Sequence, residues 1–459
     1  MRKTEEKTPR ASRNGTRASK KAAADTMKIA VAGYKSIFEE REIEVRPLTL
    51  LAGANSAGKS SMLQPLLLLK QTLEETYDPG ALLLTGNHIK FTSADQLLSK
   101  VSKSERADSF SIRLSYGPED LMIRFQKHQG KGFDIPEMVY KSLRKESKLI
   151  PNMTHEEIEA LLPRNMRDGF ISSNNSESTR WAIVRNRCFL VLGIKTQSGR
   201  APFGLDDFLA ARLTPNLNRT RTDIRDLIHL PGLRGNPERT YPVTAVGWRF
   251  PGTFENYTAS VIAEWAEQKS DKLEALCEDL RRLNLTSTVT AQRVNDAQVE
   301  LQVGRLPERP KGRGRIDMVN IADVGFGMSQ TLPVIVALHA ARPGQIVYIE
   351  QPELHLHPSA QLAMAEVLAG AAQRGVRVIA ETHSSLILIG VQTLIAEQKL
   401  KPELVKLHWF TREDGSTQVT PADFDDAGRF GDWPVDFDDV ALKAQSHYLD
   451  AAEERLSRH

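Results

Sequence analysis

The residues with the most recognisable chemistry form a glycine-rich loop, where the sequence from Gly53 to Ser60 matches the pattern G-x-x-x-x-G-K-[ST] without a gap. Gly53 and Gly58 permit backbone angles at which a side chain would clash, so the loop N–H groups can converge on phosphate oxygens. We expect Lys59 to reach the β- and γ-phosphates of a nucleotide and the Ser60 hydroxyl to bind Mg²⁺. A chance glycine-rich turn is the alternative. The residues expected to contact the nucleotide are Gly53, Asn55, Ser56, Ala57, Gly58, Lys59, Ser60 and Ser61.

An apolar strand that ends in an acid, Ile346 to Glu350, is the second chemical element. A carboxylate at the tip of a central strand lies beside the phosphate loop and can hold the Mg²⁺ shell, so Glu350 is the expected metal-binding acid. The chain continues as Gln351-Pro-Glu353. Glu353 is the nearest further acid that could orient or deprotonate an attacking water. Glu350, Gln351 and Glu353 are therefore candidate catalytic residues.

Three histidines lie near these acids. His355 and His357 alternate, with His383 downstream, which is one arrangement that can bind a metal. A tight turn whose imidazoles form hydrogen bonds across an interface is the preferred interpretation. His383 directly follows a strand expected at 376–380 and its extension Glu381-Thr. A polar residue at that place can sense the γ-phosphate, so His383 joins the catalytic candidates.

A second loop of small residues, Asp323-Val-Gly-Phe-Gly-Met-Ser-Gln330, precedes an apolar helix that starts near Thr331. Small residues with a serine at a helix N-terminus suit a phosphate contact. Taken alone, the loop is explained better by an ordinary glycine-rich helix start. It lies about 20 residues before the acidic strand end. This position makes Gly327, Ser329 and Gln330 candidate nucleotide contacts.

These loops need strands and helices to position them. Strands are expected at 29–32, 42–51, 110–116, 121–125, 289–303, 346–349 and 376–380. Helices are expected at 60–73, 154–162, 260–283, 359–374 and 385–398. Alternation of strands and helices in the last third predicts a parallel sheet with right-handed crossovers. The expected fold class is therefore α/β.

The expected domain organisation has five parts. Residues 1–26 carry eight Lys or Arg against three acids and predict a disordered basic tail. This tail is a candidate contact for nucleic acid, and a solvated leader is the alternative. The N-terminal lobe with the glycine-rich loop spans 27–130, a mostly helical insertion 131–285, the C-terminal lobe 286–400 and a short C-terminal module 401–459.

The bulk composition excludes several classes. Hydrophobic residues make up 40% of the 459 and the net charge is +3, which suits a globular core. No window approaches the roughly 20 apolar residues of a membrane helix, so no membrane partner is expected. The start of the chain lacks the apolar segment of a signal peptide and predicts a cytoplasmic protein. Cys188 and Cys277 imply neither a disulfide framework nor a zinc site.

The combination of motifs resembles the ABC-type ATPases of the SMC, RecF and OLD kind. It is most similar to bacterial AAA-family ATPases with a GFG-S-Q signature and an E-Q-P-E-x-H-L-H-P Walker B, many of which are associated with phage-defence operons. Tyr34-Lys-Ser-Ile resembles the FKS element of RecF and SMC heads. Residues 429–437 resemble the short C-terminal module of the group. The resemblance covers about 27–100 and 315–440.

The resemblance implies an ABC-ATPase-type head with a mixed or parallel sheet and helices, which takes ATP and Mg²⁺. It implies that Ser60 and Glu350 hold the metal and that His383 is the switch histidine. It further implies that Gly327, Ser329 and Gln330 touch the γ-phosphate of nucleotide bound to a second copy. The partners would be a head-to-tail homodimer or higher oligomer and an operon-encoded effector such as a nuclease.

One residue departs from the wider class. An acidic residue usually follows the Walker B acid and serves as general base, but Gln351 stands there in this chain. A glutamine can position water and accepts its proton poorly, so either Glu353 takes the role or turnover is slow. The Q-loop glutamine remains open between Gln71 and Gln96.

The first functional hypothesis is an ATPase switch that controls a separate effector in phage defence or DNA metabolism. The alternative is a self-contained OLD-like DNA nuclease, which would need a nuclease domain where only about 75 residues follow His383. A transporter subunit would show an LSGGQ-like signature, and an SMC-like tether would show long heptads. Aspartates that could be mistaken for nuclease metal ligands, but are better explained as a solvated acidic loop, are Asp423, Asp425, Asp426, Asp436, Asp438 and Asp439.

Overall fold

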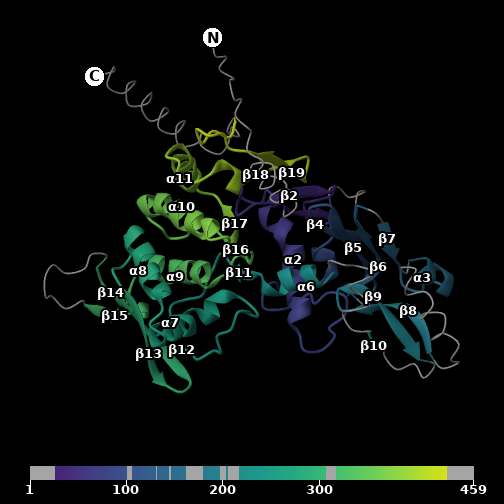
Figure 1. The fold of residues 1–459 in the computed structure, drawn as a ribbon, viewed down its shortest axis with the longest axis horizontal. Helices are drawn as coiled ribbons and strands as arrows, with labels where there is room; N and C mark the ends of the chain where they lie inside the picture. The colour runs from purple at the N-terminus through teal and green to yellow at the C-terminus, as the bar shows by residue number, and fades with distance from the viewer. Residues whose placement is uncertain are drawn as a thin grey trace, which may run out of the picture.

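The computed structural model shows an α/β protein, as the sequence predicts (Figure 1). It describes residues 26–100, 106–130, 132–143, 146–161, 179–196, 203–204, 217–306 and 317–431. All but the last residue of the expected basic tail, and the part of the expected C-terminal module from 432 onwards, lie outside the described residues. Asp436, Asp438 and Asp439 fall in that second segment.

A six-stranded central sheet carries the predicted loops at one edge. Its strand order is β11-β16-β17-β3-β18-β19, and all neighbours are parallel except the hairpin of β18 and β19. The strands are β3 (Leu48–Gly53), β11 (Ile228–Leu230), β16 (Ile346–Glu350), β17 (Arg377–Thr382), β18 (Val405–Glu413) and β19 (Ser416–Ala422).

The inner strands β3, β16 and β17 are buried on both faces, which explains why they are mostly apolar. In β16, Ile346 and Tyr348 belong to one core cluster, and Val347 and Ile349 belong to the other. Successive side chains of a strand point to opposite faces, so each core takes every second residue. On the face with Val347 and Ile349 pack three helices: α9 (Phe326–Ala340), α10 (Pro358–Gln373) and α11 (Ser385–Ala396). On the face with Ile346 and Tyr348 packs α2 (Lys59–Glu74).

The register of the parallel strands brings three distant segments together. Glu350 at the end of β16 pairs with Glu381 of β17, and Thr382 of β17 pairs with Ala52 of β3. The chain segments that follow these strands therefore leave the sheet at the same edge. That edge, at the carboxyl ends of the strands, is where open α/β sheets bind ligands.

A second six-stranded sheet is antiparallel and lies on the far side of α2 (Figure 1). Its order is β2-β1-β4-β5-β6-β7. Its strands are β1 (Met27–Ala32), β2 (Arg41–Val45), β4 (Ser109–Tyr116), β5 (Glu119–His128), β6 (Gly132–Lys141) and β7 (Glu146–Leu149). Leu63 and Leu66 of α2 share one core cluster with Ile29 and Ile112 of this sheet, so α2 is packed between the two sheets.

The remaining described elements form two smaller sheets and the helices around them. One sheet contains β8 (Thr179–Asn186), β9 (Phe189–Thr196) and β10 (Phe203–Gly204), and the other contains β12 (Tyr241–Pro242), β13 (Val289–Asn295), β14 (Gln298–Gly304) and β15 (Met318–Asn320). The further helices are α3 (His155–Leu161), α6 (Leu217–Asp226), α7 (Thr258–Glu267) and α8 (Asp271–Arg282), with short 3-10 turns at Ala94–Gln96, Phe254–Tyr257, Ile321–Asp323 and Pro402–Leu404.

Three details differ from the sequence expectations. The strand expected at 42–51 is two strands, β2 and β3, because Pro47 between them lacks the N–H that a continuous ladder needs. The helix expected at 260–283 breaks around Lys269, which has a φ of +51°. The segment 131–285 contains strands as well as helices, and its strand β11 belongs to the central sheet. With only three residues, β11 is too short to show a periodicity.

The expected C-terminal module also begins inside the head. Strand β18, which lies within 401–459, pairs in parallel with β3 from Val405 to Phe410. No helix in the described parts of the chain combines the length and apolar character that crossing a bilayer requires.

A buried histidine makes the stability of this fold depend on pH. Burial lowers the pKa of His408 in β18 from 6.5 to about 4, so below pH 6.5 the unfolded chain binds a proton that the folded chain does not. The free energy of unfolding should then fall by roughly 3 kcal/mol for this group between pH 6.5 and 4. His408→Gln should make that fall shallower in urea melts at each pH. The exposed His128 is the matched control, and an unchanged slope in His408→Gln would contradict the assignment.

Candidate functional site

The glycine-rich loop follows β3 and ends at the start of α2, and its glycines are required by close contacts. Gly53 has a φ of +147°, and a Cβ there would lie 2.2 Å from the Phe410 carbonyl oxygen. Gly58 has a φ of +103°, and its Cβ would lie 2.2 Å from Thr417 Oγ1. The hairpin of β18 and β19 therefore packs directly against the loop and fixes its shape. Ser56 adds a left-handed residue, with a φ of +61°.

Lys59, the first residue of α2, points back into the loop. Its ammonium donates to the carbonyl oxygens of Gly53 at 2.9 Å and Ala54 at 2.8 Å, and it lies 3.5 Å from His383 Nδ1. The side chain is almost fully buried. Burial lowers the pKa of Lys59, although the nearby Glu381 and Glu353 oppose the change. A buried ammonium without an ion pair at hydrogen-bond distance suits an incoming anion.

A cavity of about 510 Å³ opens beside this loop. Its lining residues come from the loop, α2 and the tips of the neighbouring strands: Lys35, Ser36, Asn55, Ser56, Gly58, Lys59, Ser60, Ser61, Gln64, Gln351, Glu381, His383 and Arg412. Six of the predicted contacts thus share one cavity with Gln351 and His383. Gly53 and Ala57 support the loop from behind, the latter through its carbonyl, which accepts from Thr417 Oγ1 at 2.9 Å.

Motif reasoning from the sequence missed five of these lining residues: Lys35, Ser36, Gln64, Glu381 and Arg412. Lys35 Nζ donates to Gln64 Oε1 at 2.6 Å, and burial lowers the pKa of Lys35. The resemblance of Tyr34-Lys-Ser-Ile to an FKS element was the one signal that pointed to this stretch. Neither Gln71 nor Gln96, the two Q-loop candidates, is among the described lining residues. Gln71 instead donates to the Leu83 carbonyl at 2.6 Å.

The expected metal-binding acid, Glu350, is held from the side away from the loop. Its Oε1 lies 3.3 Å from His229 Nε2, and its Oε2 accepts from the Gly232 N–H at 3.2 Å. Burial opposes ionisation, but these hydrogen bonds and the charge of Arg234 hold the pKa of Glu350 below its ordinary value. Glu350 is therefore a carboxylate of fixed orientation at the tip of β16.

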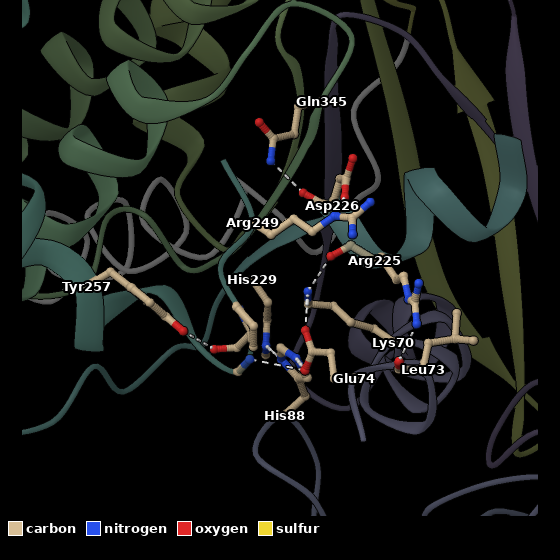
Figure 2. Close-up of polar contacts among 12 residues, drawn as sticks. Lys70, Leu73, Glu74, His88, Arg225, Asp226, His229, Arg249, Tyr257 and Gln345 are labelled. Atoms are coloured by element: carbon tan, nitrogen blue, oxygen red, sulfur yellow. Dashed lines mark hydrogen bonds and ion pairs between the residues drawn. The ribbon is translucent and has the colours of Figure 1, made fainter. Parts of the chain in front are cut away.

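A buried polar chain continues from Glu350 into the protein. His229 Nδ1 lies 3.1 Å from His88 Nδ1, and His88 Nε2 lies 3.1 Å from Glu74 Oε2. Glu74 in turn pairs with the fully buried Lys70. Figure 2 shows these side chains joined one to the next by dashed lines. Burial lowers the pKa of His88 to about 4, which keeps that imidazole neutral at pH 7. This chain supports Glu350 in the way that outer residues orient metal ligands.

The other two catalytic candidates after β16 differ in their placement. Gln351 has a φ of +49°, donates its N–H to the Glu381 carbonyl at 2.8 Å and lines the cavity. Glu353 accepts from the backbone N–H of His383 at 2.7 Å. Burial raises the pKa of Glu353. Glu353 therefore anchors the segment that carries His383, and Gln351 is the residue that faces the cavity.

The second small-residue loop lies at the surface, at the start of α9. Phe326 is 52% exposed, and a Cβ at Gly327 would lie 2.9 Å from the His355 carbonyl oxygen. Ser329 is 8% exposed and its hydroxyl donates to the Phe326 carbonyl at 3.1 Å. Gln330 is buried, with Oε1 accepting from the Arg234 N–H and Nε2 donating to the Gly235 carbonyl. Of the three candidates, Gln330 is committed to holding a neighbouring loop.

Arg234 connects this loop to the acidic strand end. Its guanidinium donates to the carbonyl oxygens of Gln330 at 3.1 Å, Glu350 at 2.5 Å and Gln351 at 3.3 Å. Burial lowers the pKa of Arg234 to about 10, which still leaves it charged at pH 7. A movement at the start of α9 is therefore coupled by direct hydrogen bonds to the tip of β16.

The residues singled out as alternative metal ligands have other partners. His357 is the N-cap of α10, where its Nδ1 accepts from the Ser359 N–H. Asp423 pairs with Lys406 and Arg46, and Asp425 accepts from the Arg429 N–H in a turn. Across the described residues, no group of three or more His, Cys, Asp or Glu is arranged to hold a metal ion.

Comparison with known proteins gives one partial family match. Residues 292–389 match a family described as "AAA domain, putative AbiEii toxin, Type IV TA system". The matched stretch includes the second loop, Glu350 and His383, and it leaves the glycine-rich loop at 53–60 outside. The chain has no match among curated proteins.

Among solved structures, the chain is similar to heads of SMC proteins. An Smc head bound to the C-winged helix domain of ScpA shares 12% identity with a TM-score of 0.45, over 88% of this chain and 99% of that one. The SMC head domain from Thermotoga maritima shares 10% identity with a TM-score of 0.36, over 86% of this chain and 98% of that one. The Pyrococcus furiosus Smc head bound to the C-terminal domain of ScpA shares 12% identity with a TM-score of 0.41, over 87% of this chain and 96% of that one. At these values the likeness assigns no role to any residue of this chain.

Substitution of one loop glycine tests the observed geometry. Gly58→Ala should lower the free energy of unfolding by about 2 kcal/mol, because its φ is left-handed and its Cβ would collide with Thr417. Gly247→Ala is the matched control, since its backbone is not left-handed and its Cβ would meet nothing within 4 Å. Chemical denaturation of both variants measures the effect, and equal stabilities would show that the loop conformation is wrong.

Proposed function

We propose that this chain binds ATP in the loop between β3 and α2 and hydrolyses it. The observation that carries the proposal is the gathering of Lys59, Ser60, Gln351, Glu381 and His383 in one cavity at the carboxyl edge of a parallel sheet. The start of α2 adds its unpaired N–H groups and the positive end of its dipole. The match of residues 292–389 to an AAA domain family supports the same function.

The donor set beside Lys59 fits Mg²⁺. The Ser60 hydroxyl, which lines the cavity, and the Glu350 carboxylate at the tip of β16 supply only oxygen, the ligand atom that Mg²⁺ prefers, and leave further positions to water and phosphate oxygens. When bound, Mg²⁺ would neutralise charge on the phosphates. Ser60 and Glu350 are proposed to hold the ion, as the sequence analysis expects.

Slow turnover is part of the proposal. Gln351 faces the cavity and can orient a water molecule, but an amide accepts a proton poorly. Glu353, the other candidate base, is engaged by the His383 backbone N–H. Nucleotide binding is then the stronger function, and hydrolysis resets it.

A second copy of the chain is proposed to complete the site. Within the part of the chain that the structure describes, Gly327 and Ser329 line cavities other than the one beside Lys59. A head-to-tail dimer would set the exposed Phe326, with the buried Ser329 one helical turn behind it, against nucleotide held by its partner. ATP would stabilise the paired state because it contacts both copies there.

The proposed output is control of a separate effector protein. The description of the matched family names a putative toxin of a type IV TA system, and an effector-directed role in antiviral defence is our proposal for this chain. A cytoplasmic location and a contact of the basic tail with nucleic acid remain proposals.

Nucleotide binding has a direct test. Lys59→Met should weaken binding of a fluorescent ATP analogue at least a hundredfold, because it removes the only lysine that lies within the loop and leaves the apolar length of the side chain. Lys399→Met, at an exposed position, is the control. Binding and phosphate release should be measured for both with Mg²⁺. Equal affinity in Lys59→Met and wild type would exclude the loop as the nucleotide site.

Pairing has a separate test by mass. Wild type should shift from one copy to two when ATP and Mg²⁺ are added, as followed by light scattering. Phe326→Asp and Ser329→Arg should remain single, and Leu143→Asp, which replaces an exposed leucine elsewhere, should still pair. A wild type that stays single with ATP, or variants that pair normally, would count against the head-to-tail arrangement.

A further inference from the structure

Glu381, the last residue but one of β17, occupies the centre of the site although no sequence motif singled it out. Strand β17 lies between β16 and β3, and Glu381 pairs in register with Glu350 on one side and Leu51 on the other. It is therefore one strand nearer to the glycine-rich loop than Glu350 is.

The contacts of Glu381 differ from those of Glu350. Glu381 Oε1 accepts from the Ser60 hydroxyl at 2.8 Å, and Oε2 accepts from the Tyr348 hydroxyl at 2.9 Å. Glu350 makes its hydrogen bonds to His229 and Gly232, away from the loop. Glu381 is among the residues that line the cavity beside Lys59, whereas Glu350 is not among the described ones.

The hydrogen bond to Ser60 has a direct consequence for metal binding. It uses the proton of the Ser60 hydroxyl and so leaves the lone pairs of that oxygen free. A serine held in this way presents an acceptor to a cation, with a carboxylate directly behind it. Neutral serine alone would rotate freely between donating and accepting arrangements.

The charge at the two strand tips also favours a cation. Glu350 and Glu381 are partners on adjacent strands, where Glu381 is buried and the Glu350 side chain is 25% exposed. Two carboxylates this close are mutually destabilising unless a positive charge lies between them.

We propose that Glu381 is a carboxylate of the Mg²⁺ site: it holds Ser60 with its lone pairs toward the ion and supplies negative charge that Gln351, in the usual place of an acid, does not. This inference rests on the proposed nucleotide function. Glu381 acts partly through Ser60 and is in that respect a positioning residue. We therefore expect its substitution to weaken metal binding and to leave nucleotide binding without metal unchanged.

The test separates metal binding from nucleotide binding without metal. The affinity for a non-hydrolysable ATP analogue is measured by calorimetry in EDTA and again with Mn²⁺, and bound Mn²⁺ is followed by electron paramagnetic resonance. Glu381→Gln keeps the shape and an acceptor for Ser60, so it should bind the analogue in EDTA as wild type does. Mn²⁺ should raise the affinity of Glu381→Gln for the analogue at least tenfold less than it raises that of wild type, and the spectrum of bound Mn²⁺ should change. Glu381→Asp should recover part of the gain.

Glu278→Gln, at an exposed acid on α8, is the matched control and should retain the full gain. If wild type gains affinity with Mn²⁺ and Glu381→Gln keeps that gain, the inference is overturned and the nucleotide function stands. If Glu381→Gln loses affinity equally in EDTA and Mn²⁺, the residue acts on loop shape and the inference is also overturned. If wild type binds no analogue under either condition, the proposed function falls with it.

Discussion

The alignment of three parallel strand tips is the constraint on which the site depends. Hydrogen bonds between β16, β17 and β3 set Glu350 opposite Glu381 and Thr382 opposite Ala52. Because the two faces of the sheet belong to different cores, a slip of one residue would turn every side chain of a strand to the wrong face. The packing that stabilises the sheet therefore also fixes the register of the site, and one cannot change without the other.

The electrostatics of the site follow from this arrangement. The edge gathers one buried ammonium, Lys59, near Glu350, Glu353 and Glu381, and each acid is held by hydrogen bonds from backbone or neutral side chains. Among the described residues that line the cavity, the cations Lys35, Lys59 and Arg412 accompany the single acid Glu381, and this balance suits an anionic ligand. Orientation is provided in advance by the His229 and His88 pair behind Glu350 and by Tyr348 behind Glu381. Such preorganisation lowers the cost of ordering the site when a ligand arrives.

Arg234 gives this edge a mechanical link to the surface. It joins Gln330 in α9 to the backbone at Glu350 and Gln351, while Gly232 in the same loop holds the Glu350 carboxylate. The loop follows β11, which is itself hydrogen-bonded to β16. The start of α9 is therefore joined by hydrogen bonds to the strand tip that carries Glu350 and Gln351.

The sequence by itself determined the local parts of this protein. Gly53, Gly58, Lys59 and Ser60 predicted a phosphate loop, because a tight turn between an apolar strand and an apolar helix needs those residue types. The period of the apolar residues likewise predicted α2, β16, α10, β17 and α11. Such features depend on neighbours a few residues away, and they are visible in a single stretch of chain.

The tertiary structure decided which distant residues meet. In the sequence, Glu381 is visible only as the residue before Thr382 and His383. Its hydrogen bond to Ser60 spans 321 positions and forms because β17 lies between β16 and β3. Three other features could not be predicted for the same reason: the short strand β11, the hydrogen bonds between Arg234 and Gln330, and the hydrogen bond between His229 and Glu350. Periodicity reports which face of an element is buried, whereas strand order and register, which arise from packing of the whole chain, report what that face is buried against.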